Sequence, residues 1–401
     1  MNKIKGILYL IVFFIISYSC VSGYHYFFGT AQPTIKMEGI ARDQYYGNEI
    51  PCKIYINDSY KIAEISAWLD DKPLFNKNKI NTKICEYPFT ISTVSLKDGQ
   101  HTLKIQAENG LYNRKKTTQE VSFFVDNKLL HAAVIKNEPS YKVNQGRTLR
   151  VKLQVNKPIK QAFVEVFNKS YQCFPESKNS SIYDCFMPVM CEEKPGDYVI
   201  HIQISDLVGN TVKLDEKLQV AQFPFKRQNL KVDPEKVKKE KEIGLSDDQL
   251  EKELEVLAQK SPFEKLWNGI FYAPTEIKAI STEYGTIRVT QEKGRYMHKA
   301  LDIVNAPKSI IWAPQDGRVV IKERYALSGN TVVIDHGCGI LSLFYHLDDF
   351  AENLKVGMNV KQGNPLGTLG KTGYASGYHL HWEMRIHNIA VDPQQWIDQY
   401  F

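Results

Sequence analysis

The stretch YHLHWEM, residues 378–384, determines how the C-terminal third of this chain is interpreted. Two histidines, His379 and His381, flank Leu380, and a tryptophan follows. In a strand, positions i and i+2 share a face about 6–7 Å apart, whereas in a helix they diverge around the axis. The nearby aromatic and β-branched residues favour a strand. We therefore predict a strand with both imidazoles on one face and Leu380 packed on the other.

Such a pair of histidines has two interpretations: one ring binds a metal beside a catalytic neighbour, or both are ordinary polar residues facing solvent. Other polar residues nearby bear on this choice, because His298 and Asp302 lie in YMHKALDI and His346 lies in LFYHLDD. Asp302 stands between two apolar residues, where an unpaired carboxylate is costly. A divalent cation would remove that cost, and so would an ion pair with an arginine such as Arg295 or Arg318.

The spacing of His298 and Asp302 adds a geometric condition. In an ideal strand these residues would be ~13 Å apart, which is too far to share a metal. The HKAL stretch must therefore bend, or begin in a loop, if both bind one ion. Zinc accepts imidazole nitrogen and carboxylate oxygen together, and catalytic zinc sites typically have three protein ligands and one open position. Two histidines and one carboxylate meet that requirement, and two further histidines remain for proton transfer.

The region also contains motifs that resemble peptidase family M23, the LytM or lysostaphin-type zinc metallopeptidases. They are HKALDIVNAPKSIIWAPQDGRVV, GNTVVIDHG, SLFYHL, VKQGNPLGTLGKTGYASGYHLHWEM and AVDPQQW. The matching region extends from about Ser281 to Trp396, a little under a third of the chain. The resemblance implies a β-sheet peptidase domain, which we predict at residues 272–401.

The resemblance also implies roles for individual residues. His298, Asp302 and His381 would bind Zn²⁺. His379 would be the general base toward water at the metal, and His346 would stabilise or protonate the tetrahedral intermediate. The family cleaves stem-peptide crosslinks or interpeptide bridges in peptidoglycan. Some members lack ligands and only regulate other hydrolases, but all five positions are intact here. We therefore expect a zinc endopeptidase of peptidoglycan, and the alternative is a non-catalytic activator or wall-binding protein.

The N-terminus predicts export. Lys3 and Lys5 precede a long apolar segment, and no charged residue follows until Lys36. A basic start and an apolar core indicate an export signal, and the segment is also long enough to span a membrane. A third interpretation is a lipoprotein acylated at Cys20. We assign residues 1–30 to a signal or membrane anchor, and expect the remaining chain to be membrane-tethered in the cell envelope.

The next two hundred residues predict strands with one buried face. Apolar and polar residues alternate at 149–155 and again at 198–204. A faint repeat aligns GQHTLKIQAENGLYN (99–113) with GDYVIHIQISDLVGN (196–210). Its offset is close to the ~100 residues of an immunoglobulin-type sandwich. We therefore predict two immunoglobulin-like β-sandwiches, at residues 32–127 and 128–223.

Residues 224–271 predict a charged linker that contains a helix. Ser246 is a good N-cap and Gln249 completes a capping box. Apolar residues then recur at helical spacing: Leu250, Leu254 and Leu257. A helix with one apolar stripe beside a peptidase domain also raises the hypothesis of autoinhibition.

Composition sets broader limits. The chain has 401 residues, 43% hydrophobic and 24% charged residues and a net charge of +6. These values indicate a globular protein and give no reason to expect nucleic-acid binding; we expect a monomer. Disulfides are permitted outside the cytosol, and we consider pairing of Cys52 with Cys85 and of Cys173 with Cys185 or Cys191. The expected fold is mainly β: an anchor or signal, two sandwiches, a helical linker and a LytM-type peptidase domain.

Overall fold

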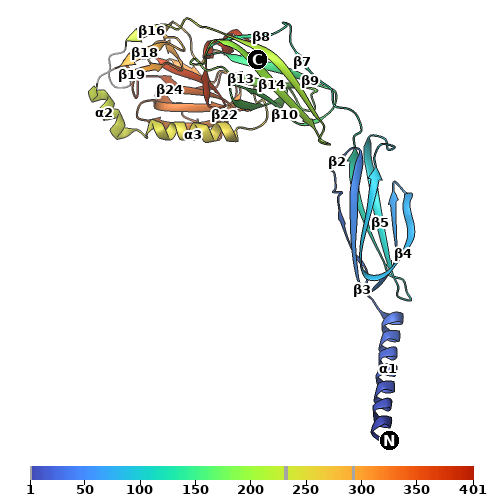
Figure 1. The fold of residues 1–401 in the computed structure, drawn as a ribbon. Coiled ribbons are helices and arrows are strands. Elements are labelled where there is room, and N and C mark those ends of the chain that lie inside the picture. Colours follow the sequence, from blue (N-terminus) through green and yellow to red (C-terminus); the bar gives the residue numbers. More distant parts are fainter. Residues whose placement is uncertain (1, 230–233, 291–293) are drawn as a thin grey trace. The chain divides into compact units, whose positions relative to one another are not determined.

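The computed structural model describes residues 2–229, 234–290 and 294–401, and its fold is mainly β, as predicted (Figure 1). Residues 230–233 of the predicted linker lie outside the described residues. The chain divides into two compact units. The first comprises Met1–Leu129 and Leu207–Asn210, and the second comprises Leu130–Asp206 and Thr211–Phe401. The domain boundaries proposed from the sequence stay a prediction.

The first unit begins with α1 (Asn2–Phe28). Its apolar part, Gly6–Phe28, is long and apolar enough to cross a membrane by length and composition. A signal sequence near an N-terminus has the same properties, so the helix agrees with both a signal and an anchor.

The rest of this unit is a β domain with the strands β1 (Thr34–Glu38), β2 (Tyr45–Tyr46), β3 (Glu49–Leu69), β4 (Lys72–Ser92), β5 (Gly99–Asn109) and β6 (Lys116–Val125). They form one continuous sheet instead of the separate pair expected of a sandwich. The reason is the length of β3, which pairs with β1 near its start and with β5 near its end. Its pairing with β4 shifts register between Asn57 and Ile62, and such irregularities bend strands. The core includes Ile54, Ile65 and Ile105.

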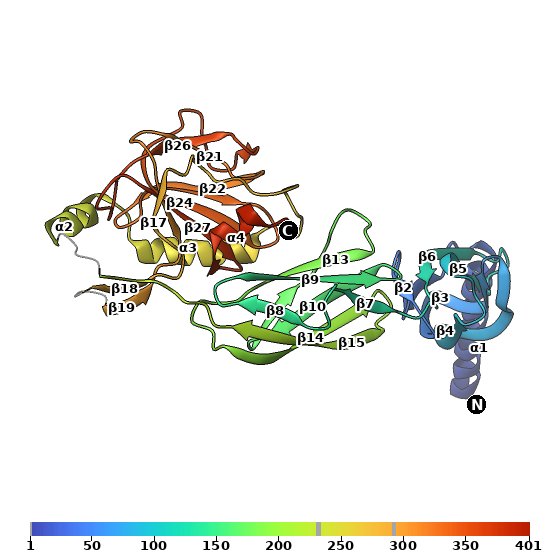
Figure 2. The same cartoon turned by 90° about the horizontal axis from the view of Figure 1, so that it is seen from above.

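The second β domain contains β7 (Ala132–Ile135), β8 (Tyr141–Asn144), β9 (Thr148–Val155), β10 (Ile159–Val166), β11 (Lys169–Gln172), β12 (Phe174–Pro175), β13 (Ile182–Pro188), β14 (Gly196–Asp206) and β15 (Thr211–Ala221). It is a sandwich of two sheets, β12-β13-β9-β7 and β11-β10-β14-β15-β8 (Figure 2). The predicted alternation is confirmed, because Val151, Leu153 and Ile202 are buried in the core. The faint repeat marks equivalent strands, since β5 and β14 both begin at its glycine and both have 11 residues.

The strand register tests the proposed disulfides. Cys85 lies opposite Ile56, four positions along β3 from Cys52, which corresponds to ~13 Å. A disulfide needs Cα atoms about 4.4–6.8 Å apart, so the Cys52–Cys85 pair is wrong. Cys173 and Cys185, by contrast, are neighbours beside the pairing of β12 with β13, and their thiols contact each other.

The C-terminal part contains β16 (Arg227–Asn229), β17 (Ala279–Thr282), β18 (Ile287–Thr290), β19 (Gly294–Met297), β20 (Leu301–Val304), β21 (Ile310–Trp312), β22 (Gly317–Tyr325), β23 (Gly329–Asp335), β24 (Ile340–Phe350), β25 (Asn359–Val360), β26 (Pro365–Leu369), β27 (Leu380–Ile386) and β28 (Ile389–Val391). Its helices are α2 (Pro234–Ile243), α3 (Asp247–Lys260) and α4 (Pro393–Asp398). A sheet in the order β17-β20-β27-β24-β23-β22-β25 dominates it, and β16, β18 and β19 form a small second sheet. One face of β24 and β27 carries Phe344 and Trp382 into the main core.

Helix α3 packs on the opposite face of that sheet (Figure 1). Ser246 caps it, as predicted, by accepting a hydrogen bond from the Asp248 backbone N–H. The predicted capping box does not form, because the amide of Gln249 donates to Glu253 instead. Leu250 and Leu254 are buried in a cluster with the following sheet residues: Tyr325, Leu341, Leu343 and Tyr345. Part of the predicted linker is therefore packed against the C-terminal sheet.

Candidate active site

Strand β27 presents alternating side chains to the two faces of the sheet. Leu380 and Trp382 face the main core and are fully buried, as predicted for Leu380. His381 and Glu383 face the side on which α3 lies, and their ring nitrogen and carboxylate oxygen are 3.0 Å apart. His379 precedes the strand, which begins at Leu380. The prediction that one strand carries both imidazoles is therefore wrong. His379 is the last residue of the preceding loop, and His381 is the second residue of β27.

Three donor atoms of His298, Asp302 and His381 converge at the edge of β20 and β27. Asp302 lies opposite His381 in the strand register. The Oδ1 atom of Asp302 is 3.1 Å from Nε2 of His298 and 3.0 Å from Nδ1 of His381. The two ring nitrogens are 3.2 Å apart. His298 lies in the turn between β19 and β20, which supplies the bend that the sequence required.

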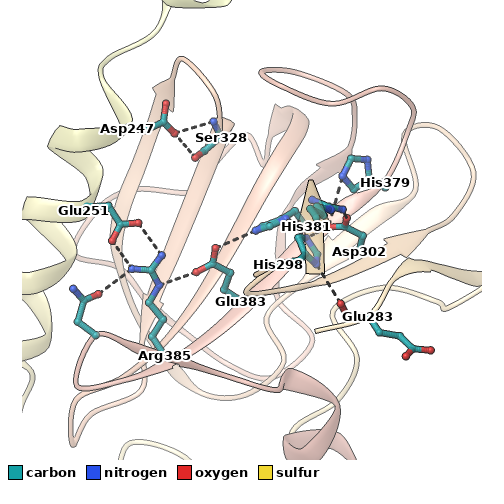
Figure 3. A network of polar contacts seen from close by, with 12 residues as sticks. Asp247, Glu251, Glu283, His298, Asp302, Ser328, His379, His381, Glu383 and Arg385 are labelled. Carbon is teal, nitrogen blue, oxygen red and sulfur yellow. Dashed lines mark hydrogen bonds and ion pairs between the residues drawn. The ribbon is translucent and has the colours of Figure 1, made fainter. Parts of the chain in front are cut away.

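This donor set fits a zinc ion. Ligands held at ~2.0–2.2 Å in a tetrahedron are themselves ~3.3–3.6 Å apart, so the three atoms need to separate by only a few tenths of an ångström. The outer nitrogens also set the tautomers. His381 donates from Nε2 to Glu383, and His298 donates from Nδ1 to the Glu283 carbonyl at 3.4 Å (Figure 3). Once a metal replaces the protons on the two inner nitrogens, their lone pairs point at the same place.

The electrostatics of the cluster favour a positive charge. Burial by itself raises the pKa of Asp302, but hydrogen bonds from His298 and His381 hold that pKa well below its ordinary value. Burial lowers the pKa of His381, yet its hydrogen bonds to Asp302 and Glu383 outweigh this and raise the pKa to about 9. Two ionised carboxylates thus enclose the His381 ring, and a divalent cation would satisfy them.

An arginine also contacts Asp302, although it is neither of those suggested by the sequence. Arg288 on β18 donates to Oδ2 of Asp302 at 2.7 Å and to Oγ1 of Thr282 at 2.8 Å. An ion pair and a metal were alternatives at the level of sequence. The structure separates them by atom, because Arg288 uses Oδ2 while Oδ1 faces the histidines.

His346 and His379 flank the donor cluster, with ring centroids 4.9 Å apart. His346 donates from Nδ1 to the Thr372 carbonyl at 2.9 Å, and His379 donates from Nδ1 to the Gly377 carbonyl at 3.0 Å. In both rings the free nitrogen is therefore Nε2, which for His379 lies 3.8 Å from Asp302 Oδ1. Burial lowers the pKa of each imidazole, so both are neutral near pH 7.

A backbone irregularity turns His346 out of the sheet. Pairing of β24 with β27 ends where Tyr345 lies opposite His381. The next residue, His346, has a φ of 66°, a conformation that is costly for a residue with a side chain and is concentrated at functional sites. Its backbone N–H donates to the carbonyl of Ser328. The five predicted residues thus line one cleft of about 1190 Å³, and Asp247 and Glu251 of α3 line its side.

Comparison with known proteins assigns a family to this part of the chain. Residues 296–393 match the sequence model of peptidase family M23. The C-terminal domain belongs to this family. The match confirms the predicted resemblance, and its range includes all five candidate residues: His298, Asp302, His346, His379 and His381.

Two curated relatives extend this finding. The peptidoglycan DD-endopeptidase ShyC of Vibrio cholerae is 34% identical over 124 residues, covering 30% of this chain and 28% of that protein. The DD-carboxypeptidase/endopeptidase Mpg of Neisseria meningitidis is 34% identical over 97 residues, covering 24% of this chain and 22% of that protein. The chain therefore spans less than a third of the length of these relatives.

Two solved structures are also similar. A putative peptidase M23 from Pseudomonas aeruginosa has 23% identity and a TM-score of 0.46, with 65% of this chain and 96% of that chain covered. The catalytic domain of lysostaphin from Staphylococcus simulans has 26% identity and a TM-score of 0.27, with 30% and 92% covered.

Sequence reasoning missed several polar neighbours of the M23 site. Arg385 follows Glu383 at the i+2 spacing of β27 and donates to its carboxylate at 2.7 Å, so strand alternation from His381 would have found it. Arg288 and Glu251 reach the site from β18 and α3. Neither carries a local signal, because only the tertiary fold brings these distant segments to the cleft.

Proposed function

We propose that this protein is a zinc-dependent endopeptidase that hydrolyses peptide crosslinks or bridges of bacterial peptidoglycan. One observation carries the proposal: Nε2 of His298, Oδ1 of Asp302 and Nδ1 of His381 converge within 3.2 Å of one another, beside two further neutral imidazoles. The match of the domain to family M23 supports a peptidase. The substrate class is supported by the names of the two relatives, both of which are endopeptidases.

In this proposal His298, Asp302 and His381 hold the metal. A bound zinc ion would act as a Lewis acid that polarises the scissile carbonyl and acidifies water. The backbone carbonyl of Glu283 and the carboxylate of Glu383 hold the outer ring protons, so the inner nitrogens are the ones that would give up their protons to a metal. Arg288 occupies the outer oxygen of Asp302 and thereby orients the inner one.

His379 and His346 carry the proton transfers. The pKa of His379 is below its ordinary value because the ring is buried, so the neutral ring accepts a proton from attacking water at Nε2. His346 is held by Thr372 in the same way, with Nε2 unprotonated in the resting site. In this proposal Nε2 of His346 first takes up the proton that His379 accepted from water, and it then stabilises the tetrahedral oxygen or passes that proton to the leaving amine.

The N-terminus supports action outside the cytoplasm. The apolar helix α1 has the length and composition of a membrane-spanning segment, and the lysines that precede it favour a cytoplasmic N-terminus. We propose that the β domains and the M23 domain follow on the extracytoplasmic side, where peptidoglycan lies.

The direct test measures muropeptides released from purified sacculi by the full chain, together with its zinc content. We expect about one zinc per chain, release of peptide-cleaved fragments, and loss of release in His379→Ala with retained zinc. His131→Ala is the matched control, because His131 is an exposed histidine outside the M23 domain.

A chain that binds sacculi but releases nothing, with and without added zinc, would contradict the endopeptidase proposal. That result would favour the non-catalytic activator or wall-binding protein instead.

A further inference from the structure

A continuous chain of charged hydrogen bonds runs from helix α3 to the metal-site histidine (Figure 3). The carboxylate of Glu251 accepts two bonds from Arg385, at 2.7 and 2.9 Å. The Nε atom of Arg385 donates to Oε2 of Glu383 at 2.7 Å. The other oxygen of Glu383 accepts from Nε2 of His381 at 3.0 Å. Glu251 is therefore three contacts from the His381 ring, whose Nδ1 atom faces the donor cluster.

The side chains in this series of hydrogen bonds differ in how deeply they are buried. The side chains of Arg385 and Glu383 are 8% and 7% exposed, whereas that of Glu251 is 56% exposed. A buried guanidinium requires hydrogen-bonding partners, and it prefers to bind one carboxylate through two nitrogens at once. Here Glu251 accepts one N–H from each terminal nitrogen, Asn388 accepts another from Nη1 at 3.0 Å, and Nε donates to Glu383. Glu251 thereby holds the guanidinium from the side opposite Glu383 and fixes the direction in which Nε points.

The arrangement of partners around Arg385 affects the position of His381. Without Glu251, the terminal nitrogens of Arg385 would lose their carboxylate and keep only the neutral amide oxygen of Asn388, so the guanidinium would turn toward the remaining carboxylate, Glu383. The carboxylate of Glu383 would then move with it and weaken its bond to His381. Since that bond fixes the tautomer and the orientation of the ring, the inner nitrogen would be less well placed for a metal.

We propose that Glu251 is a positioning residue of the M23 site, which holds His381 in its metal-binding orientation through Arg385 and Glu383. The inference rests on the proposed metal site and assigns part of it to α3, outside the matched residues 296–393.

Contacts other than these hydrogen bonds also hold α3 in place. Asp247, one turn before Glu251 on the same face of the helix, accepts hydrogen bonds from the backbone N–H groups of Leu327 and Ser328 at 2.7 and 3.0 Å. Leu250 and Leu254 are buried against the sheet. Helix α3 therefore presents Glu251 to Arg385 from a fixed position.

The test compares Glu251→Gln with Glu255→Gln, a matched control that removes an exposed carboxylate from the same helix. The readouts are the zinc dissociation constant, from competition with a chromophoric chelator, and the visible spectrum of the Co²⁺-substituted protein. Removing a direct partner of a metal ligand typically weakens metal binding 10–100-fold, so we expect that range for Glu383→Gln. For Glu251→Gln, one contact further away, we expect a weakening of about 3–10-fold and an altered Co²⁺ spectrum.

The double variant distinguishes positioning from a general loss of stability. If Glu251 acts through Glu383, adding Glu251→Gln to Glu383→Gln leaves the zinc dissociation constant unchanged. Fully additive effects on zinc binding would overturn the inference. It would also be overturned if Glu251→Gln bound zinc within twofold of Glu255→Gln and gave the same Co²⁺ spectrum, while the proposed function would stand. Wild-type protein that binds no stoichiometric zinc would overturn both.

Discussion

At the scale of single residues, the two pairs of histidines differ in where the inner ring nitrogen lies. Nε2 of His298 and Nδ1 of His381 are 3.2 Å apart and within 3.1 Å of Oδ1 of Asp302, whereas Nε2 of His379 is 3.8 Å from that oxygen. His381 also donates to the carboxylate of Glu383, which makes its ring a stronger metal ligand. These environments support the division into metal ligands and proton carriers.

This division predicts that two substitutions differ in their effect on zinc binding. His379→Ala should lower the rate of muropeptide release by about 10²–10⁴-fold, the usual contribution of a general base, and should retain zinc. His381→Ala should lose zinc as well as activity. The measurement is the rate of release together with the metal content of each variant. Loss of zinc from His379→Ala, or full activity in either variant, would contradict the assignment.

His336 predicts a pH dependence of stability that is separate from the active site. It is fully buried, between the Asp316 carbonyl and the Ser342 hydroxyl, and burial lowers its pKa to about 4. Below about pH 6.5 the His336 imidazole takes up a proton in the unfolded chain but stays neutral in the folded chain. Protonation of His336 therefore lowers the free energy of unfolding as the pH falls toward 4. The expected loss from His336 is about 2 kcal/mol between about pH 7 and about pH 5.

Urea denaturation with a chelator present would measure this loss. The His336→Gln variant should lose less stability than the wild type over the same pH interval, although it starts from a lower value. Equal losses in the two proteins would show that other groups account for the pH dependence.

At the scale of elements, helix α3 is the element whose position in the structure differs most from the position that its sequence pattern predicted. The pattern predicted a helix in a linker, and the helix is present with its predicted N-cap. Its apolar stripe, however, packs on Tyr325 and Leu343 of the sheet, and Asp247 and Glu251 line the cleft. A charge-rich sequence does not reveal this, because the hydrogen-bonding partners of Asp247 and Glu251 lie 80 and 134 residues further along the chain.

The packing of α3 predicts a stability effect. Leu254→Ala removes a fully buried side chain and should lower the free energy of unfolding by about 2–5 kcal/mol. Val256→Ala is the matched control, since Val256 is 45% exposed on the same helix and should change stability by less than about 0.5 kcal/mol. Chemical denaturation of both variants checks this. Similar small effects would mean that the helix is not packed on the sheet in solution.

Strands were predictable wherever one face is buried and the other is polar. The alternation at 149–155 and 198–204 corresponds to β9 and β14. The M23 motifs located all five candidate residues because their types and spacing are local features. The single continuous sheet of the first β domain and the position of His379 before β27 depend on register and on loop geometry, which short patterns do not specify.

At the scale of the molecule, the β-sandwich of β7–β15 and the M23 domain share an aromatic core. Phe186 of β13 contacts Trp267 and Trp396, with ring centroids 5.8 Å apart in both cases. The indole N–H of Trp396 donates to Oγ1 of Thr148 at 3.1 Å. The two domains therefore belong to one compact unit, and the sandwich contributes to the stability of the peptidase domain.

This shared core predicts how fragments behave. A fragment of residues 130–401 should unfold in one cooperative transition. A fragment of residues 272–401 lacks α3, Trp267 and the sandwich, so it should melt at lower temperature or aggregate because it exposes apolar surface. Circular dichroism melting of the two fragments measures the difference. Equal melting temperatures would contradict a stabilising role for the sandwich and α3.

The central claim is that three side chains from separate segments bind one metal ion. Anomalous diffraction at the zinc edge, from crystals of the protein grown with zinc, tests it most directly. We predict a single strong peak in the cleft, about 2.0–2.2 Å from Nε2 of His298, Oδ1 of Asp302 and Nδ1 of His381. A map with no peak there, or with Asp302 turned away from both histidines, would contradict the account.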